Sequence, residues 1–232
     1  MNGVWEMLSA WLREAQVQPI TTQVTPEIQT AGIGLLVLVG MMVLWEDWRV
    51  LLVLWTGVTV AVAFLLMPLL PLPWALSRLV AAGVGGTLLW LGARRRPRLP
   101  FRLNSGLWVR LPVVGMAGLA LWQLQPYLLQ IWPNPVYITS VAGLLLGGMA
   151  LIALGGEVVR STLGAQLWVH AAFFLLAWWK VSTSWVPWLT VVDLALAATG
   201  GMIAASEGLW ARYQGLTQRF PAGNRNRTQW HR

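Results

Sequence analysis

Residues 28–70 read IQTAGIGLLVLVGMMVLWEDWRVLLVLWTGVTVAVAFLLMPLL, an apolar stretch interrupted by one charged cluster at 46–49. About 20 apolar residues are enough for a helix to cross a bilayer, so this stretch is too long for one crossing. The charged cluster therefore marks a turn, and we expect an all-α integral membrane protein. The same criterion, applied outward along the chain, predicts seven spans, at residues 27–45, 50–70, 74–93, 111–131, 136–155, 162–180 and 187–210.

The composition agrees with a membrane protein and excludes several functions. Of the 232 residues, 57% are hydrophobic and 10% are charged, and the mean hydropathy is +0.62. Because the chain has no cysteine, disulfides, thiolate catalysis and cysteine-ligated clusters are excluded. The sequence has no phosphate-binding loop, metal-ligand cluster or nucleophile triad, so we expect no catalytic site, metal or cofactor.

The basic residues are divided unequally between the two sides of the membrane. If the seven spans alternate in direction, thirteen basic residues fall on one side, while the other side receives only Arg13 and Lys180. Cytoplasmic loops carry the excess of Lys and Arg, so we place the N-terminus outside and the C-terminus in the cytoplasm. The net charge of +8 is then a property of membrane loops, and no nucleic acid partner is expected. The membrane would be a bacterial-type inner membrane or an equivalent energy-transducing membrane.

The chain divides into five segments by composition. Apolar residues at helical spacing near the start predict a short amphipathic helix, which would lie on the membrane or on a partner subunit. Three spans follow, then a basic loop with a linking fourth span, then three more spans and a basic cytoplasmic tail. The segments are residues 1–25, 26–96, 97–135, 136–212 and 213–232.

The two three-span segments carry the same marks in the same order. Each has Gly-Leu-Leu, Glu-x-x-Arg, an apolar run, Pro-Trp, a charged residue and Gly-Gly, which favours a duplication. One span separates the two units, and from this odd separator we expect the second unit to enter from the opposite face. The prediction is a set of 3+1+3 inverted repeats, related by a pseudo-two-fold axis. The marks begin at Gly34, Glu46, Pro73, Arg78 and Gly85 in the first unit, and at Gly143, Glu157, Pro187, Asp193 and Gly200 in the second.

Arg78 and Asp193 occupy matched positions inside predicted spans. A charged side chain costs about 2.5–3.5 kcal/mol at the centre of a membrane helix, so such groups face the protein interior, pair, or line a wet cavity. Two interpretations remain open: a polar path for protons or ions, or a buried ion pair that holds helices or subunits together. For Arg78, extension of the side chain to the near interface is a further alternative.

Three other features have both structural and functional interpretations. His170, inside the sixth span, is a candidate proton-relay group or ligand of a haem or chlorin, although a histidine bonded to a neighbouring helix is the commoner case. Glu46 with Arg49, and Glu157 with Arg160, are i,i+3 charge pairs at predicted cytoplasmic turns. We interpret these turn pairs as exposed and weakly stabilising.

The second half of the chain resembles a known family of membrane subunits. The stretches LLLG, EVVRSTLGAQL, LLAW and VDLA at residues 144–147, 157–167, 175–178 and 192–195 are similar in layout to membrane component E of hydrogenase-4-type complexes. The last three spans look like subunit K of respiratory complex I and the matching subunit of cation/proton antiporters. These families carry a membrane-embedded Glu in the helix after the Arg turn. Here that region reads Leu167-Trp168-Val169-His170, without a Glu.

The resemblance implies a subunit without catalytic activity of its own. It would belong to a multisubunit complex that translocates protons or ions or transfers electrons, beside antiporter-like membrane subunits. Arg78, Asp193 and His170 would be its remaining polar groups in the membrane. Two alternatives stay open, a stand-alone small carrier and a pigment- or haem-binding scaffold.

Overall fold

The computed structural model describes residues 24–94, 107–131, 134–154, 157–179 and 184–219. The predicted N-terminal amphipathic helix and the end of the basic tail lie outside these residues. Seven helices are present in the described part, and each is long and apolar enough to cross a membrane. They are α2 (Pro26–Leu44), α3 (Trp48–Leu66), α4 (Leu72–Ala93), α5 (Leu107–Ile131), α6 (Pro135–Leu154), α7 (Val158–Trp178) and α8 (Trp185–Arg219).

Local sequence signals define the first two helices. Pro26 occupies the first turn of α2, and the Thr25 hydroxyl oxygen accepts a hydrogen bond from the Ile28 amide at 3.5 Å. At the charged cluster, the Asp47 carboxylate caps α3 by accepting a hydrogen bond from the Arg49 amide at 2.9 Å. The predicted turn between the first two spans is therefore confirmed.

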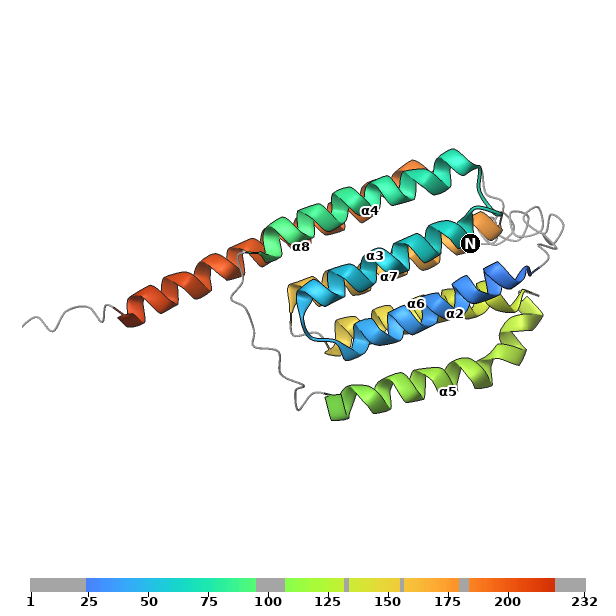
Figure 1. Ribbon diagram of the computed structural model, residues 1–232, viewed down its shortest axis with the longest axis horizontal. Coiled ribbons are helices and arrows are strands. Elements are labelled where there is room, and N and C mark those ends of the chain that lie inside the picture. Colours follow the sequence, from blue (N-terminus) through green and yellow to red (C-terminus); the bar gives the residue numbers. More distant parts are fainter. Residues whose placement is uncertain (1–23, 95–106, 132–133, 155–156, 180–183, 220–232) are drawn as a thin grey trace, which may run out of the picture.

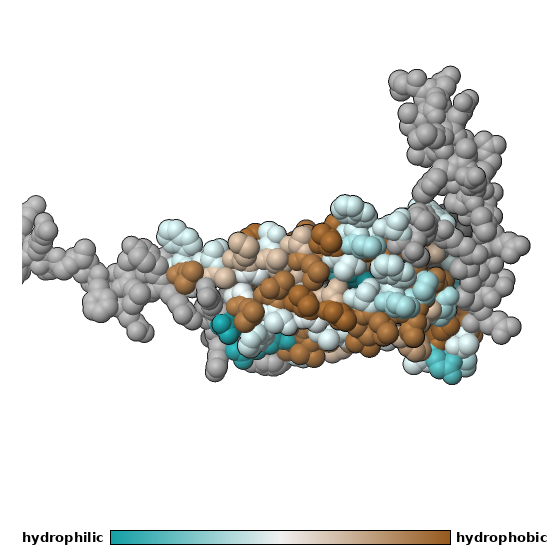
Figure 2. Space-filling view, turned by 90° about the horizontal axis from the view of Figure 1, so that it is seen from above, coloured by the Kyte–Doolittle hydropathy of each residue, from teal (hydrophilic) through white to brown (hydrophobic). Residues whose placement is uncertain are grey.

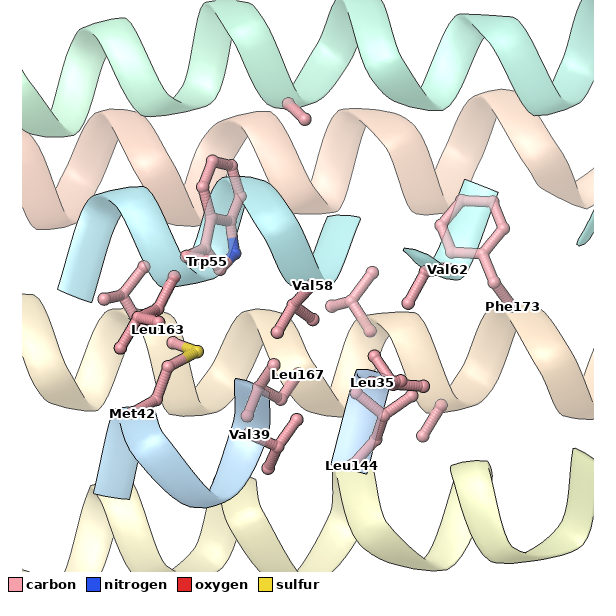
Figure 3. Packing of buried hydrophobic residues seen from close by; sticks show 14 of the residues in the cluster. Leu35, Val39, Met42, Trp55, Val58, Val62, Leu144, Leu163, Leu167 and Phe173 are labelled. Carbon is pink, nitrogen blue, oxygen red and sulfur yellow. The ribbon is translucent and has the colours of Figure 1, made fainter. Parts of the chain in front are cut away.

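The helices form two stacked layers (Figure 1). One layer contains α2, α3 and α4, and the other contains α6, α7 and α8. Each helix packs against its counterpart: α2 against α6, α3 against α7, and α4 against α8. Apolar side chains fill the space between the layers, as Figure 3 shows for Leu35, Val39, Met42, Trp55, Val58, Val62, Leu144, Leu163, Leu167 and Phe173.

The two layers run in the same direction, so the predicted inverted topology is wrong. Near the start of both helices Gly32 of α2 lies against Val136 of α6, and farther along Val39 lies against Gly147. Three helices separate α2 from α6, so the chain makes four crossings between their starts and returns to the same face. The prediction failed because it counted only the single span between the units.

The predicted pseudo-two-fold axis is also absent from this arrangement. For inverted repeats this axis lies in the membrane plane and would make counterpart helices antiparallel, whereas α2 and α6 run parallel. The helices of both layers follow the same order, so a translation from one layer to the other relates each helix to its counterpart. The α5 helix lies at the edge formed by α2 and α6, opposite the edge where α4 and α8 pair.

Helices α5 and α8 differ from the other helices in burial and in length. Helix α5 contains Pro112 and Pro126 and has no buried residue in its membrane-length segment. Helix α8 has 35 residues, and at about 1.5 Å per residue it exceeds the roughly 30 Å of a bilayer core. It continues beyond the predicted end of the last span at residue 210 and projects from the bundle (Figure 1).

The surface of the bundle agrees with immersion in lipid. In the view of Figure 2, apolar residues dominate the middle of the face, while the strongly hydrophilic residues lie mostly toward the two ends. Exposed large apolar residues occur on all seven described helices. A bilayer is therefore the natural surrounding of this surface.

Candidate functional site

Arg78 of α4 and Asp193 of α8 form an ion pair inside the bundle. Arg78 Nη2 lies 3.0 Å from Asp193 Oδ2, and the two residues are 0% and 2% exposed. Because their side-chain atoms are in contact, both groups lie at the same depth in the bundle. The charge on each group is thus compensated within the protein.

His170 of α7 extends this pair toward α3. Its Nδ1 atom lies 2.8 Å from Arg78 Nη2, and its Nε2 atom lies 3.3 Å from the Thr59 hydroxyl oxygen. The Thr59 hydroxyl in turn donates to the main-chain oxygen of Trp55 at 3.0 Å. His170 is 0% exposed, and both ring nitrogens have partners. Neither nitrogen is free to ligate a haem or chlorin in this arrangement.

Gln166 and Phe173 complete the cluster from α7. The Gln166 amide nitrogen lies 3.4 Å from the main-chain oxygen of Asp193, and the Arg78 guanidinium carbon lies 3.8 Å from the centre of the Phe173 ring. An aromatic face attracts a cation, and the attraction is stronger away from water. We call Thr59, Arg78, Gln166, His170, Phe173 and Asp193 the buried polar cluster.

Small residues allow the four helices to meet at this cluster. Gly85 of α4 packs against Ala197 of α8, where an added Cβ would lie 3.2 Å from the alanine side chain. The same position is 3.8 Å from the Trp55 ring and 3.9 Å from the Gln166 amide nitrogen. Gly200 of α8 lies against Thr162 of α7. Close backbone approach is the usual role of small residues between membrane helices.

The polar atoms of the cluster are only partly paired. Within the described residues, Arg78 Nε and Nη1, Asp193 Oδ1 and Gln166 Oε1 are buried without a hydrogen-bond partner. Unpaired buried polar groups are uncommon because each costs about 1–3 kcal/mol. The guanidinium is therefore held through Nη2 and the Phe173 ring, and its other two nitrogens are not anchored by protein.

The turn residues belong to a second cluster, at the end of the bundle. Arg160 is only 3% exposed, and its Nη2 donates to the main-chain oxygen of Trp45, the C-cap of α2. The prediction of an exposed, weak turn residue is therefore wrong for Arg160, because the side chain turns inward to cap the end of a neighbouring helix. Glu46 pairs instead with Arg110 of α5 at 2.8 Å.

The other two turn residues keep positions near the surface. Arg49 is exposed, with its guanidinium carbon 5.3 Å from the centre of the Trp48 ring. Glu157 is half-buried at the N-cap position of α7. The two i,i+3 pairs thus differ in environment although they have the same sequence pattern.

Sequence reasoning missed several members of the two clusters. Gln166 is four residues before His170, a spacing that places both on one face of a helix and could have indicated its role. Thr59, Phe173 and Arg110 gave no such signal, because their contacts join helices far apart in the chain.

The described residues contain no group of three or more His, Cys, Asp or Glu side chains able to hold a metal ion.

No family model, no curated protein and no solved structure matches the chain.

Proposed function

We propose that the protein is a non-catalytic integral membrane subunit of a multisubunit complex that translocates protons or another ion. The observation that carries the proposal is the buried polar cluster, which sets an arginine, an aspartate and a histidine together among helices of membrane-spanning length. Ionisable groups at such depth are costly, and their common use is in ion paths and proton relays. In this role the cluster is one element of the path.

Helix α5 supports the existence of a partner in the membrane. Within the described residues it packs mainly along the edge formed by α2 and α6, and its outer side presents large residues, including Trp108, Met116, Trp122 and Tyr127 at 67–80% exposure. Aromatic residues and methionine are enriched at protein interfaces. An antiporter-like membrane subunit beside α5 would cover this surface.

Purification in a mild detergent, followed by measurement of the native mass, tests the subunit assignment. We expect a complex that contains further membrane subunits. A monomer or homodimer without partners would overturn the assignment and favour a stand-alone carrier. Such carriers commonly have broken half-helices near the substrate site, whereas α4 and α8 are continuous through the cluster.

Proton movement is tested in vesicles that contain the whole complex. Asp193→Asn should reduce proton translocation by at least about tenfold, the effect of a barrier higher by about 1.4 kcal/mol. Thr199→Val is the matched control, since Thr199 lies on the exposed side of α8 and its hydroxyl donates to the main-chain oxygen of Ala195 in the same helix. Normal translocation and assembly in Asp193→Asn would remove the basis of a proton path.

The proposed orientation has the N-terminus outside and the C-terminus in the cytoplasm of an energy-transducing membrane. The positive-inside rule and the thirteen-to-two division of basic residues support this orientation. Because the chain has no cysteine, single cysteines are specific labels. Glu157→Cys should react with an impermeant thiol reagent only from the cytoplasmic side, and Ser184→Cys only from the outside; the reverse pattern would invert the assignment.

A further inference from the structure

One nitrogen of Arg78 binds two acceptors that belong to different helices. Arg78 Nη2 lies 3.0 Å from Asp193 Oδ2 and 2.8 Å from His170 Nδ1. Because both contacts end on the same atom, the carboxylate oxygen and the ring nitrogen are no farther apart than the sum of these two distances. The guanidinium thus sits between an anionic and a neutral acceptor.

The hydrogen bonds around His170 have only one consistent direction. A guanidinium donates and never accepts, so His170 Nδ1 is the acceptor and carries no proton. The single ring proton of a neutral histidine is then on Nε2, which donates to the Thr59 hydroxyl oxygen. The Thr59 hydroxyl in turn donates a hydrogen bond to the main-chain oxygen of Trp55. In this arrangement His170 is neutral, and its tautomer is set by Arg78.

We propose that His170 Nδ1 and Asp193 Oδ2 form an internal cation site, occupied by the Arg78 guanidinium in this structure, which takes up one proton when Arg78 withdraws. In that step a hydronium ion gives its proton to Nδ1, one N–H bond forms, and a water molecule is left. The resulting imidazolium carries the positive charge that Arg78 carried, so the charge opposite Asp193 stays balanced. This inference deepens the proposed function and rests on it for the role in transport.

The anchoring of Arg78 allows this exchange. Arg78 Nε and Nη1 have no partner within the described residues, so withdrawal breaks the two contacts of Nη2 and the contact with Phe173. The polar groups that face His170 are Arg78 from α4 and Thr59 from α3, with Asp193 of α8 behind the guanidinium. A nitrogen beside a carboxylate oxygen suits a proton, whereas Na⁺ and similar hard cations prefer several oxygen ligands.

Nitrogen NMR of histidine reads the site directly. The chain has two histidines, so ¹⁵N-histidine labelling of the full chain in lipid nanodiscs, in a His231→Gln background, leaves one labelled ring. We expect His170 to be neutral with its proton on Nε2. In Arg78→Met we expect an imidazolium, and in Arg78→Met with Asp193→Leu a neutral ring again, because the anion that stabilises the imidazolium is then absent.

Three results would overturn the proposal. They are a proton on Nδ1 in the parent protein, the same ring state in the single and double variants, and disappearance of the imidazolium of Arg78→Met when Na⁺ replaces choline in the buffer. The last would identify a metal cation in place of a proton.

A milder variant keeps the proposal testable if Arg78→Met does not fold. Thr59→Val is nearly isosteric and removes only the partner of Nε2, so the tautomer should stay as Arg78 sets it. A shift of the proton to Nδ1 in this variant would contradict the role of Arg78. These spectra do not require transport, so a complex that moves no protons would remove the proposed function and leave the cation site in place.

Discussion

At the scale of single residues, the free energy of the buried cluster depends on which charges remain paired. Arg78 and Asp193 compensate each other without solvent, at 0% and 3% side-chain exposure. Removal of Asp193 leaves the Arg78 charge uncompensated in a low-dielectric interior, which is far more costly than removal of both groups.

A double-mutant cycle measures this dependence. Asp193→Leu should lower the free energy of unfolding by about 3–5 kcal/mol. Arg78→Met should lower it by less, because a protonated His170 would then compensate Asp193, and the double variant should lie much closer to the parent protein than Asp193→Leu does. Thermal unfolding in detergent, followed by the fluorescence of the 17 tryptophans, gives the comparison. Additive losses in the double variant would show that the two charges do not stabilise each other.

Arg160 ties α7 to the C-terminal end of α2 through the Trp45 carbonyl. Arg160→Met should cost about 1.5–3 kcal/mol, the range for a hydrogen bond that involves a charged group. Arg49→Met is the matched control, because Arg49 has the same place in the repeated pattern but is exposed beside an aromatic ring, a contact that contributes about 0.5–1 kcal/mol. Equal losses in the two variants, measured by the same unfolding assay, would contradict a specific role for the Trp45 contact.

At the scale of helices, close contact between α4 and α8 holds the ion pair in register. Gly92 lies against the Gly201 main chain, and Gly201 lies against the Leu88 main chain. The two backbones therefore touch without intervening side chains, which is how glycine strengthens helix pairs in lipid. The Arg78–Asp193 contact and the glycine contacts occur along the same face of each helix.

A methyl group at this seam should separate the helices. Gly92→Ala places a Cβ on the Gly201 main-chain oxygen and should destabilise the protein by about 1–3 kcal/mol. Gly83→Ala, in the same helix, meets nothing within 4 Å and should be neutral or stabilising by about 0.5–1 kcal/mol. The midpoint of thermal unfolding distinguishes the two. A similar midpoint for both variants would show that the seam tolerates a larger separation.

At the scale of the whole molecule, the chain forms one three-helix layer and then stacks a second layer on it in the same order and direction. This stacking brings α4 and α8, α3 and α7, into the contacts that assemble the buried polar cluster. With an inverted second layer, the starts of α4 and α8 would lie at opposite ends of the bundle, and the two charges would not share one depth.

Cross-linking tests the direction of the layers. Gly32→Cys with Val136→Cys should form a disulfide on mild oxidation, because the two residues touch near the starts of α2 and α6. Gly32→Cys with Leu154→Cys should not, since Leu154 ends the 20-residue α6, about 30 Å from its start, and a disulfide requires Cα atoms within about 7 Å. Mass measurement of the oxidised variants shows which cysteine pair has formed a disulfide. A disulfide in the Gly32/Leu154 pair but not in the Gly32/Val136 pair would indicate inverted layers.

Sequence signals alone predicted the number and approximate limits of the membrane-length helices in the described part of the chain. The signals are local: apolar runs of spanning length, the charged turn at 46–49 and the Thr25-Pro26 start. Each depends only on the hydropathy of neighbouring residues or on hydrogen bonds between them. The matched positions of Arg78 and Asp193 also indicated a possible pair. The common direction of the layers follows from an even number of crossings, although the separator alone led to the opposite prediction.

Packing between helices, in contrast, determines which helices face each other and which side chains meet. The stacking of α2 on α6 and of α4 on α8 depends on how small and large side chains fit across helices distant in sequence, and no period within one helix encodes that fit. For the same reason the sequence did not predict the contact of Thr59 with His170, or the hydrogen bond from Arg160 to the Trp45 carbonyl, which removes Arg160 from the surface. The sequence thus predicted that Arg78, Asp193 and His170 lie inside spans, and packing between the two layers brings them into contact.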